Sequence, residues 1–141
     1  MPDTIREVQL VTMKRKHICL TGEDKYGHWW FEIGDPANPS SESYGWWPVS
    51  PVGPKVTAFG VAGELNGQTN FRGRPTRDPH HGDDADEVFH PLVPVSDGRT
   101  DDEIAHCLRQ FAQSYHGSWR WTLGKGQNCH TFQDQALKHC R

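Results

Sequence analysis

The feature that most constrains this chain is its shortage of aliphatic side chains. Val, Leu, Ile and Phe together make up only 26 of 141 residues, a fraction typical of disordered chains when the net charge is also high. Here 15 basic and 18 acidic side chains leave a net charge of only −3, and 6 Trp and 3 Tyr supply apolar bulk. We therefore expect one folded domain with an aromatic core. The 14 Gly and 10 Pro predict many loops.

Three classes of protein do not fit the pattern of apolar and charged residues. No apolar run approaches the roughly 18 residues that a membrane-spanning helix needs. The first residues contain no apolar segment of the secretory type, so we expect a protein that is cytoplasmic as made and that is exported, if at all, by a non-Sec route. The slightly acidic charge balance lacks the basic surface that nucleic-acid binding requires.

Alternating residues in the first half of the chain predict strands. Val8, Leu10 and Thr12 alternate with polar neighbours, and residues 17–20 continue that extended pattern. Further strands are expected at 28–33, 42–47 and 56–61. In the strand at 28–33, alternation places Trp29, Phe31 and Ile33 on one face and His28, Trp30 and Glu32 on the other.

Residues 66–98 differ in composition from the rest of the chain. They are dense in Gly, Pro, Asp and His, which predicts a long polar loop with one strand at 87–90. Loops of this length in a compact domain are usually functional or mobile.

Two helices are expected at the end of the chain. The first begins with a capping box of Thr100 and Glu103 and ends at Gly117, and Asn128 is a good N-cap for the second. A short strand at 118–122 and a glycine turn at 124–126 separate them. The apolar residues expected to be buried are Ile104, Leu108, Phe111 and Tyr115 in the first helix and Phe132, Ala136, Leu137 and Cys140 in the second. These patterns predict an α+β fold in which a small antiparallel sheet packs against two C-terminal helices.

The four cysteines favour free thiols over a disulfide framework, because no secretory signal accompanies them. Cys129 and Cys140 fall on one helix about 16 Å apart, so a bridge would have to join different elements. Cys19, Cys107 and Cys140 are interpreted as packing residues.

Cys129 is the candidate nucleophile. It follows the predicted N-cap directly, where unpaired backbone N–H groups and the helix dipole stabilise a thiolate. Its own amide is also free to hold an oxyanion. The matching general base is His28, on the strand face opposite the apolar stripe. The alternative is an inert, partly buried thiol and an ordinary histidine at the end of a strand.

Two short motifs carry a resemblance to a known family. The run from His28 to Gly34 resembles the histidine strand of circularly permuted papain-like proteins, and Asn128-Cys129 with Phe132 and Leu137 resembles their nucleophile motif. The order of the two motifs is that of the permuted NlpC/P60 superfamily, which includes lecithin–retinol acyltransferase-like and PPPDE-type branches. The resemblance implies a permuted papain-like fold and a cysteine hydrolase with no cofactor.

The resemblance also implies residue roles and a substrate. Cys129 would be the nucleophile and His28 the general base, with a third, orienting residue on the neighbouring strand. Glu42 is the first choice for that residue, Glu32 the second, and His17 a further option. Asn128 and Gln127 are the candidates to support the oxyanion.

A peptidoglycan peptide is the expected substrate, cleaved by an amidase or endopeptidase that could act as an interbacterial effector with a protein inhibitor. Lipid acyl transfer and isopeptide cleavage are alternatives within the same chemistry.

Paired tryptophans offer a different function. In an adjacent pair on a strand the rings point to opposite faces, so Trp30, Trp46 and Trp47 could line a groove that stacks on substrate groups. The alternative function is a non-catalytic module that binds a glycan or a protein through this face. The structural alternative is that the rings replace missing aliphatic residues in the core.

The nine histidines are candidate metal ligands. The donors within one short segment are His80, His81, Asp83, Asp84, Asp86 and His90, but their spacing matches no established metal site. A solvated polar loop is the preferred interpretation. His130 with His139 and Cys140 is a weaker candidate, and no metal site is predicted.

Overall fold

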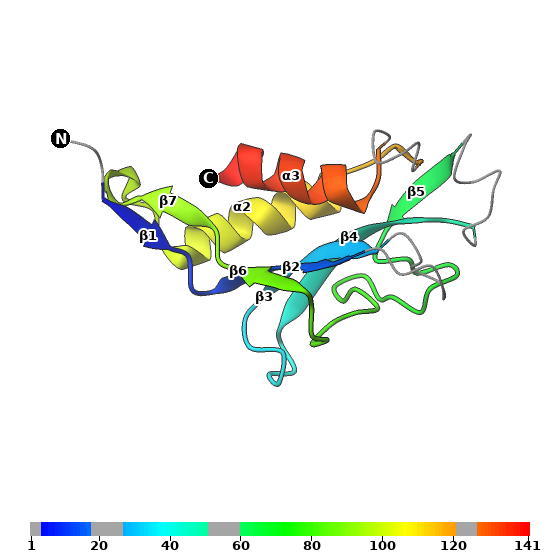
Figure 1. Cartoon of the computed structure of the whole chain (residues 1–141), viewed down its shortest axis with the longest axis horizontal. Coiled ribbons are helices and arrows are strands. Elements are labelled where there is room, and N and C mark those ends of the chain that lie inside the picture. The colour runs from blue at the N-terminus through cyan, green and yellow to red at the C-terminus, as the bar shows by residue number, and fades with distance from the viewer. Residues whose placement is uncertain (1–3, 18–26, 51–59, 121–126) are drawn as a thin grey trace.

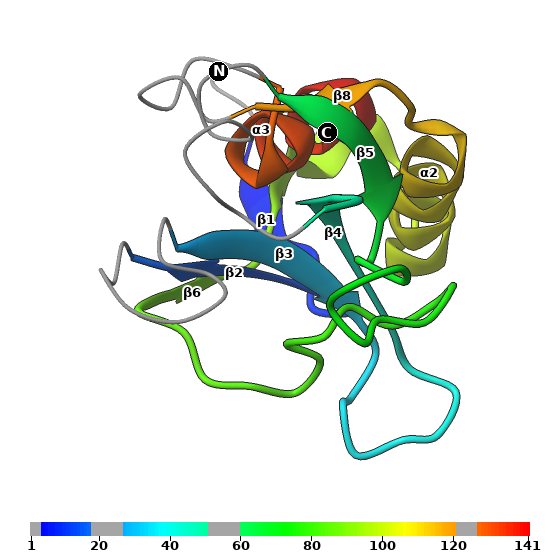
Figure 2. The same cartoon turned by 90° about the vertical axis from the view of Figure 1, so that its right-hand side faces the viewer.

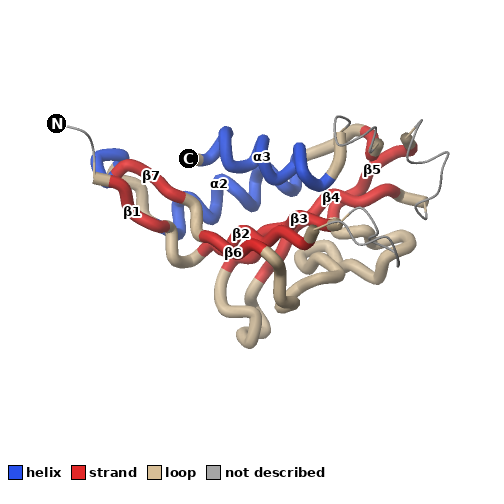
Figure 3. Tube along the Cα trace, in the orientation of Figure 1, coloured by secondary structure: helices blue, strands red, loops and turns tan. Residues whose placement is uncertain are grey.

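The computed structural model describes residues 4–17, 27–50, 60–120 and 127–141. Six of its strands form one antiparallel sheet in the order β6-β2-β3-β4-β5-β8, and β1 pairs with β7 in a separate two-stranded sheet (Figures 1 and 3). The strands are β1 (Ile5–Glu7), β2 (Val11–Lys16), β3 (His28–Ile33), β4 (Glu42–Pro48), β5 (Val61–Leu65), β6 (Glu87–Phe89), β7 (Leu92–Pro94) and β8 (Ser118–Trp119). The helices are the 3-10 turn η1 (Val95–Asp97), α2 (Asp101–Ser114) and α3 (Cys129–Cys140).

Helices α2 and α3 lie side by side and cover one face of the sheet (Figures 1 and 2). Aromatic rings fill the space between the two layers: Phe132 of α3 stacks on Phe31 of β3 at 5.9 Å and on Trp46 of β4 at 6.2 Å between ring centroids. These large rings replace the aliphatic side chains that the chain lacks. The predicted α+β fold, with a small antiparallel sheet packed against two C-terminal helices, is confirmed.

Residues 66–83 cover the opposite face of the sheet, and we call them the loop layer (Figure 2). Phe71 of this layer packs on Trp47 at 4.7 Å, and His80 packs on Trp30 at 5.2 Å, between ring centroids. The Asn66 side chain accepts from the amide of Gly45 and donates to the carbonyl of Ser43, which joins the layer to β4. Both faces of the sheet are therefore buried.

Local capping signals set the beginning of both α-helices. Thr100 and Glu103 form the expected capping box at α2, and Asn128 caps α3 with Thr131 as its reciprocal partner. Helix α2 ends at Ser114, three residues before the predicted stop at Gly117. None of the helices in the described segments combines the length and the apolar composition needed to cross a membrane.

Several strand boundaries differ from those predicted. The pattern at residues 8–12 is broken by a turn, because the chain passes there from the small β1–β7 sheet to the main sheet. The predicted strand at 87–90 is present as β6, whereas β7 was not predicted. Strand β5 begins at Val61, where the predicted strand at 56–61 ends, and residues 56–59 lie outside the described residues. The same holds for residues 18–20, including Cys19, and for 121–122 and the turn at 124–126.

Strands β3 and β4 are paired with each other over only part of their length. Their paired residues run from Ile33 and Glu42 to Trp30 and Gly45, and the pairing stops there although both strands continue. Strand β3 stays paired with β2 as far as His28, whereas β4 turns to pair with β5. The sheet therefore opens between the first residues of β3 and the last residues of β4, and we call this place the sheet opening.

A disulfide between Cys107 and Cys140 corrects the expectation of free thiols. It joins α2 to the last residue of α3, with a distance of 5.7 Å between the two Cα atoms. The sequence could not indicate this pair, because the two cysteines meet only when the helices pack side by side. Cys129 is the free cysteine of the described residues.

Reducing this disulfide should destabilise the protein. Closing a segment with a sequence separation of 33 residues restricts the unfolded chain, so we expect reduction to lower the free energy of unfolding by roughly 3–4 kcal/mol. Urea unfolding with and without a phosphine reductant measures the change. A Cys107→Ser variant is the control, since its midpoint should not respond to the reductant. An unchanged wild-type midpoint would show that the bridge contributes nothing.

Candidate active site

Cys129 is the first residue of α3, and its side chain is buried, with 2% of the residue exposed. The Asn128 side chain accepts from the amides of His130 at 2.9 Å and Thr131 at 3.4 Å. Asn128 is thus an N-cap whose side chain accepts no hydrogen bond from the amide of Cys129. Among the described residues the amide of Cys129 donates no hydrogen bond, and an N–H at the beginning of a helix is the kind of donor that can hold an oxyanion.

The first turn of α3 lies over the sheet opening. His130 stacks on Trp29 of β3 at 3.9 Å, and Phe132 stacks on Trp46 of β4, so the turn contacts both strands where they part. The Gln133 side chain donates to the carbonyl of Trp30 at 2.9 Å, which fixes the next residue of the helix to β3. These contacts place Cys129 at the end of β3 where His28 begins the strand.

His28 is held by a carboxylate that the sequence did not single out. Its Nε2 lies 2.9 Å from Oδ2 of Asp78 in the loop layer, and the two side chains are 2% and 0% exposed. Trp47 donates its Nε1–H to the same oxygen at 2.7 Å, and the amide of His80 donates to Oδ1 at 2.9 Å. Burial raises the pKa of Asp78, but the charge of His28 and these hydrogen bonds outweigh it, so the pKa lies below its usual value.

The His28 ring is also closely packed against other rings. It lies 4.0 Å from the Trp47 ring, 5.3 Å from the His80 ring and 5.6 Å from the Trp30 ring, measured between centroids. Gly45 passes directly under it: a methyl group there would lie 2.6 Å from His28 Nε2 and would also overlap Asp78. A residue without a side chain is therefore required at this point of β4. Nδ1 of His28 has no hydrogen bond among the described residues.

The structure brings His28 and Cys129 to the same end of the sheet, but not into contact. The His28 side chain lies on the face of the loop layer, whereas α3 lies on the other face, and no hydrogen bond joins the two residues in the described segments. Because β3 and β4 are unpaired at the sheet opening, no ladder of hydrogen bonds between these strands separates them there.

Glu42 is not brought to His28, which corrects the first choice of orienting residue. It pairs with Ile33 at the far end of β3, where its carboxylate accepts two hydrogen bonds of 2.7 Å from Arg109 of α2. The side-chain hydrogen bond from Arg109 lowers the pKa of Glu42 below its usual value, despite partial burial. Register decides this outcome, and the sequence does not show register.

The two other choices for the orienting residue also have different partners. Glu32 binds Lys14 at 2.9 Å and accepts from the Trp30 indole at 3.0 Å and from the Gly82 amide at 2.6 Å. His17 is largely exposed and lies near acidic side chains at the edge of the sheet. Neither residue contacts His28 in the described structure. No local pattern pointed to Asp78, which is 50 residues from His28 in the chain.

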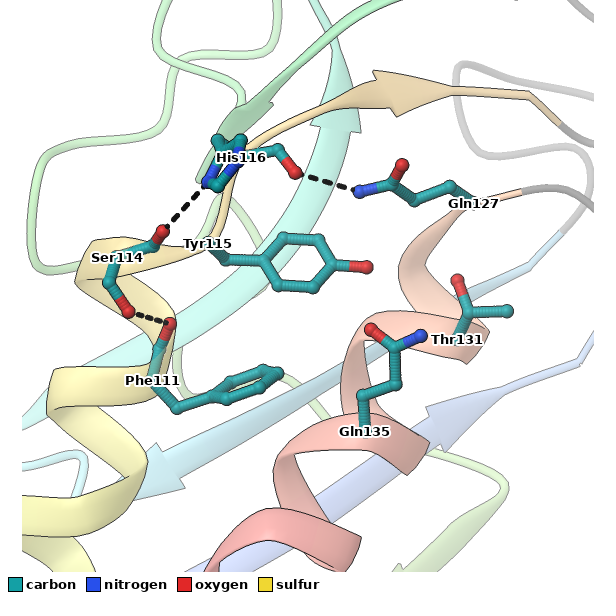
Figure 4. A pocket seen from close by; sticks show the side chains of 7 residues that line it. All are labelled: Phe111, Ser114, Tyr115, His116, Gln127, Thr131 and Gln135. Atoms are coloured by element: carbon teal, nitrogen blue, oxygen red, sulfur yellow. Dashed lines mark hydrogen bonds between the residues drawn. The ribbon is translucent and has the colours of Figure 1, made fainter.

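Gln127 lies near Cys129 in the chain but bonds elsewhere. Its side-chain amide donates to the carbonyl of His116 at 2.9 Å and lines a cavity of about 470 Å³ between α2 and the beginning of α3 (Figure 4). Figure 4 shows the Tyr115 hydroxyl pointing between Gln127 and Thr131, and burial raises the pKa of that hydroxyl. The lining residues carry hydroxyl, amide, imidazole or aromatic groups: Phe111, Ser114, Tyr115, His116, Gln127, Thr131 and Gln135.

The tryptophans predicted to line a groove are core residues. Trp30, Trp46 and Trp47 are 0%, 2% and 4% exposed, so they cannot stack on a ligand in this conformation. The rings do point to opposite faces as predicted, but both faces are covered. The binding-module alternative therefore loses the exposed face on which it was based.

The histidines of the middle segment do not converge. His80 bonds Asp83 at 2.9 Å, and His81 bonds the hydroxyls of Ser41 and Ser43. His90 lies 2.7 Å from the carbonyl of Val11. Each of these side chains is bonded within its own segment or to a neighbouring strand, and residues 66–83 pack on the sheet, whereas the sequence predicts a solvated loop.

Comparisons with known proteins identify no relative. No protein-family model matches the chain, and neither a curated protein nor a solved structure does.

A Glu42→Gln variant tests whether that residue is structural. The folded-state pKa is lowered, so the pair with Arg109 stabilises the fold above the unfolded pKa of about 4.3, and the contribution is lost as pH falls through the folded pKa. We expect a loss of about 1–2 kcal/mol at pH 7 that shrinks toward pH 3, measured by urea unfolding. The exposed Glu87→Gln is the matched control and should change little. A loss that is equal at both pH values would contradict this account.

Proposed function

We propose that this protein is a cysteine hydrolase in which Cys129 attacks an acyl carbon, His28 is the general base and Asp78 orients the imidazole. The observation that carries the proposal is the hydrogen bond between Asp78 and Nε2 of His28 at the sheet opening, over which the helix of Cys129 begins. A buried carboxylate that fixes one ring nitrogen leaves the other to exchange a proton with a nucleophile.

The ring nitrogen that Asp78 does not hold is the one that can act as the base. With Nε2 held by Asp78, Nδ1 is the atom that takes the proton of the Cys129 thiol. The thiolate then adds to the acyl carbon, and the amide of Cys129 donates to the oxyanion that forms. The leaving group takes the proton from the imidazolium, and water hydrolyses the resulting thioester with the same base.

The proposal requires one rearrangement. Cys129 and His28 have no hydrogen bond in the described structure, so the thiol and Nδ1 must approach each other through the sheet opening. Hydrogen bonds between a nucleophile and its base are often long before substrate binds and shorten in the complex.

The character of the neighbouring cavity supports a peptide as substrate. Its described lining contains no Asp, Glu, Lys or Arg, and its hydroxyl and amide groups match the donors and acceptors of a peptide backbone. Gln127 and Thr131 of this lining flank Asn128 and Cys129 in the chain. A peptidoglycan peptide is the substrate we propose, delivered by a non-Sec route and opposed by a protein inhibitor. An apolar lipid chain fits this lining less well.

Alkylation of Cys129 tests the nucleophile and its base. In the oxidised chain Cys107 and Cys140 are blocked, so iodoacetamide labelling can be followed at Cys129 by peptide mass across pH 5 to 9. We expect the rate at pH 6–7 to fall about tenfold or more in His28→Ala, because the variant lacks the base that takes the proton of the thiol. Asp78→Asn should shift the same pH profile in the same direction.

Matched variants separate catalysis from folding. Glu42→Gln removes a partly buried carboxylate of β4, opposite the far end of β3, and should leave the labelling profile unchanged. His28→Gln keeps a polar side chain of similar size, so its loss of reactivity would not result from a cavity. Equal Cys129 labelling in wild type and both His28 variants would overturn the proposal.

Hydrolysis of disaccharide peptides from peptidoglycan tests the substrate separately. Wild type should release new amine and carboxyl termini that mass spectrometry identifies, and Cys129→Ala should release none. A reactive Cys129 without cleavage of any of these peptides would retain the thiol chemistry and reject this substrate.

A further inference from the structure

We propose that Cys107, Cys140 and His139 bind a zinc ion between α2 and α3 when the two cysteines are reduced. One ligand atom from each of the three residues lies within 4.8 Å of the other two. Two thiolates and one imidazole are donors that Zn²⁺ prefers, at about 2.3 Å for sulfur and about 2.0 Å for nitrogen. This site is independent of the chemistry proposed for Cys129.

The packing of α2 against α3 brings the proposed ligands close together. Cys140 is 1% exposed, and its backbone carbonyl accepts from Arg99 at 2.7 Å, which fixes the end of α3 next to the beginning of α2. The Cα atoms of Cys107 and Cys140 are 5.7 Å apart, so both sulfurs reach a common point between the helices. His139 lies on the exposed side, with its ring 5.6 Å from that of Phe111, and can turn toward the sulfurs.

Solvent reaches the site from the side of α2. A cavity of about 400 Å³ is lined by Arg99, Asp102, Glu103, His106 and Cys107. Water in this cavity can complete a tetrahedral set of four ligands with the three side chains. Its lining carries two carboxylates, Asp102 and Glu103, and one guanidinium, Arg99, so the acidic groups outnumber the basic one.

The zinc ion and the disulfide exclude each other, because both use the same two sulfurs. Oxidation of the metal-bound thiolates forms the S–S bond, releases Zn²⁺ and gives up two electrons. A low-molecular-weight disulfide such as oxidised glutathione accepts those electrons with two protons from solvent and becomes two thiols. The helix pair would therefore be joined by metal under reducing conditions and by a covalent bond under oxidising ones.

Metal titration of a chain that keeps only these two thiols tests the proposal. In a Cys19→Ser, Cys129→Ser background, the reduced chain should bind one equivalent of zinc, and cobalt should give a thiolate-to-metal charge-transfer band. The oxidised chain should bind none. Zinc should also slow the formation of the disulfide by oxidised glutathione.

Two histidine variants test whether His139 is the third ligand. His139→Ala removes the proposed ligand from an exposed position and should weaken binding about tenfold or more. His106→Ala removes the imidazole that lines the cavity outside the trio and should leave the affinity unchanged. Circular dichroism confirms that both variants fold. Absence of binding in the reduced chain, or equal affinities of the two variants, would overturn the site.

Discussion

The Asp78 carboxylate is the interaction on which the arrangement of this molecule depends. It is fully buried and accepts from the Trp47 indole and the His80 amide while it pairs with His28, so one side chain joins β3, β4 and the loop layer. A buried carboxylate is stable only when its oxygens are satisfied in this way. Loss of any one of these partners would leave the buried charge less well compensated, and this constraint favours a loop layer that stays closed over it.

The shortage of aliphatic residues explains why the sheet is covered on both sides. Adjacent residues of a strand point to opposite faces, so the rings of Trp46 and Trp47 each need their own cover. The helices supply one cover, and the Gly-, Pro- and His-rich residues 66–83 supply the other. A segment with the composition of a surface loop therefore acts as a structural layer.

Local signals predicted the helices well and the site only in part. The caps at Thr100 and Asn128 and the alternation at 28–33 are encoded by neighbouring residues, and the structure confirms them. The pairing of Cys107 with Cys140 and the contact of Asp78 with His28 depend on how distant segments pack. Glu42 is the first choice of orienting residue from the sequence because it begins the neighbouring strand, but antiparallel register places it beside Ile33, at the end of β3 away from His28.

The disulfide turns part of the chain into a covalent ring that runs from Cys107 to Cys140. Cys129 lies inside this ring, whereas His28 and Asp78 lie outside it. The candidate nucleophile is therefore tethered by a bond, and the candidate base is held only by packing and hydrogen bonds. Local unfolding of the loop layer would release the base while the helix pair stays closed, so the two halves of one site can differ in local stability.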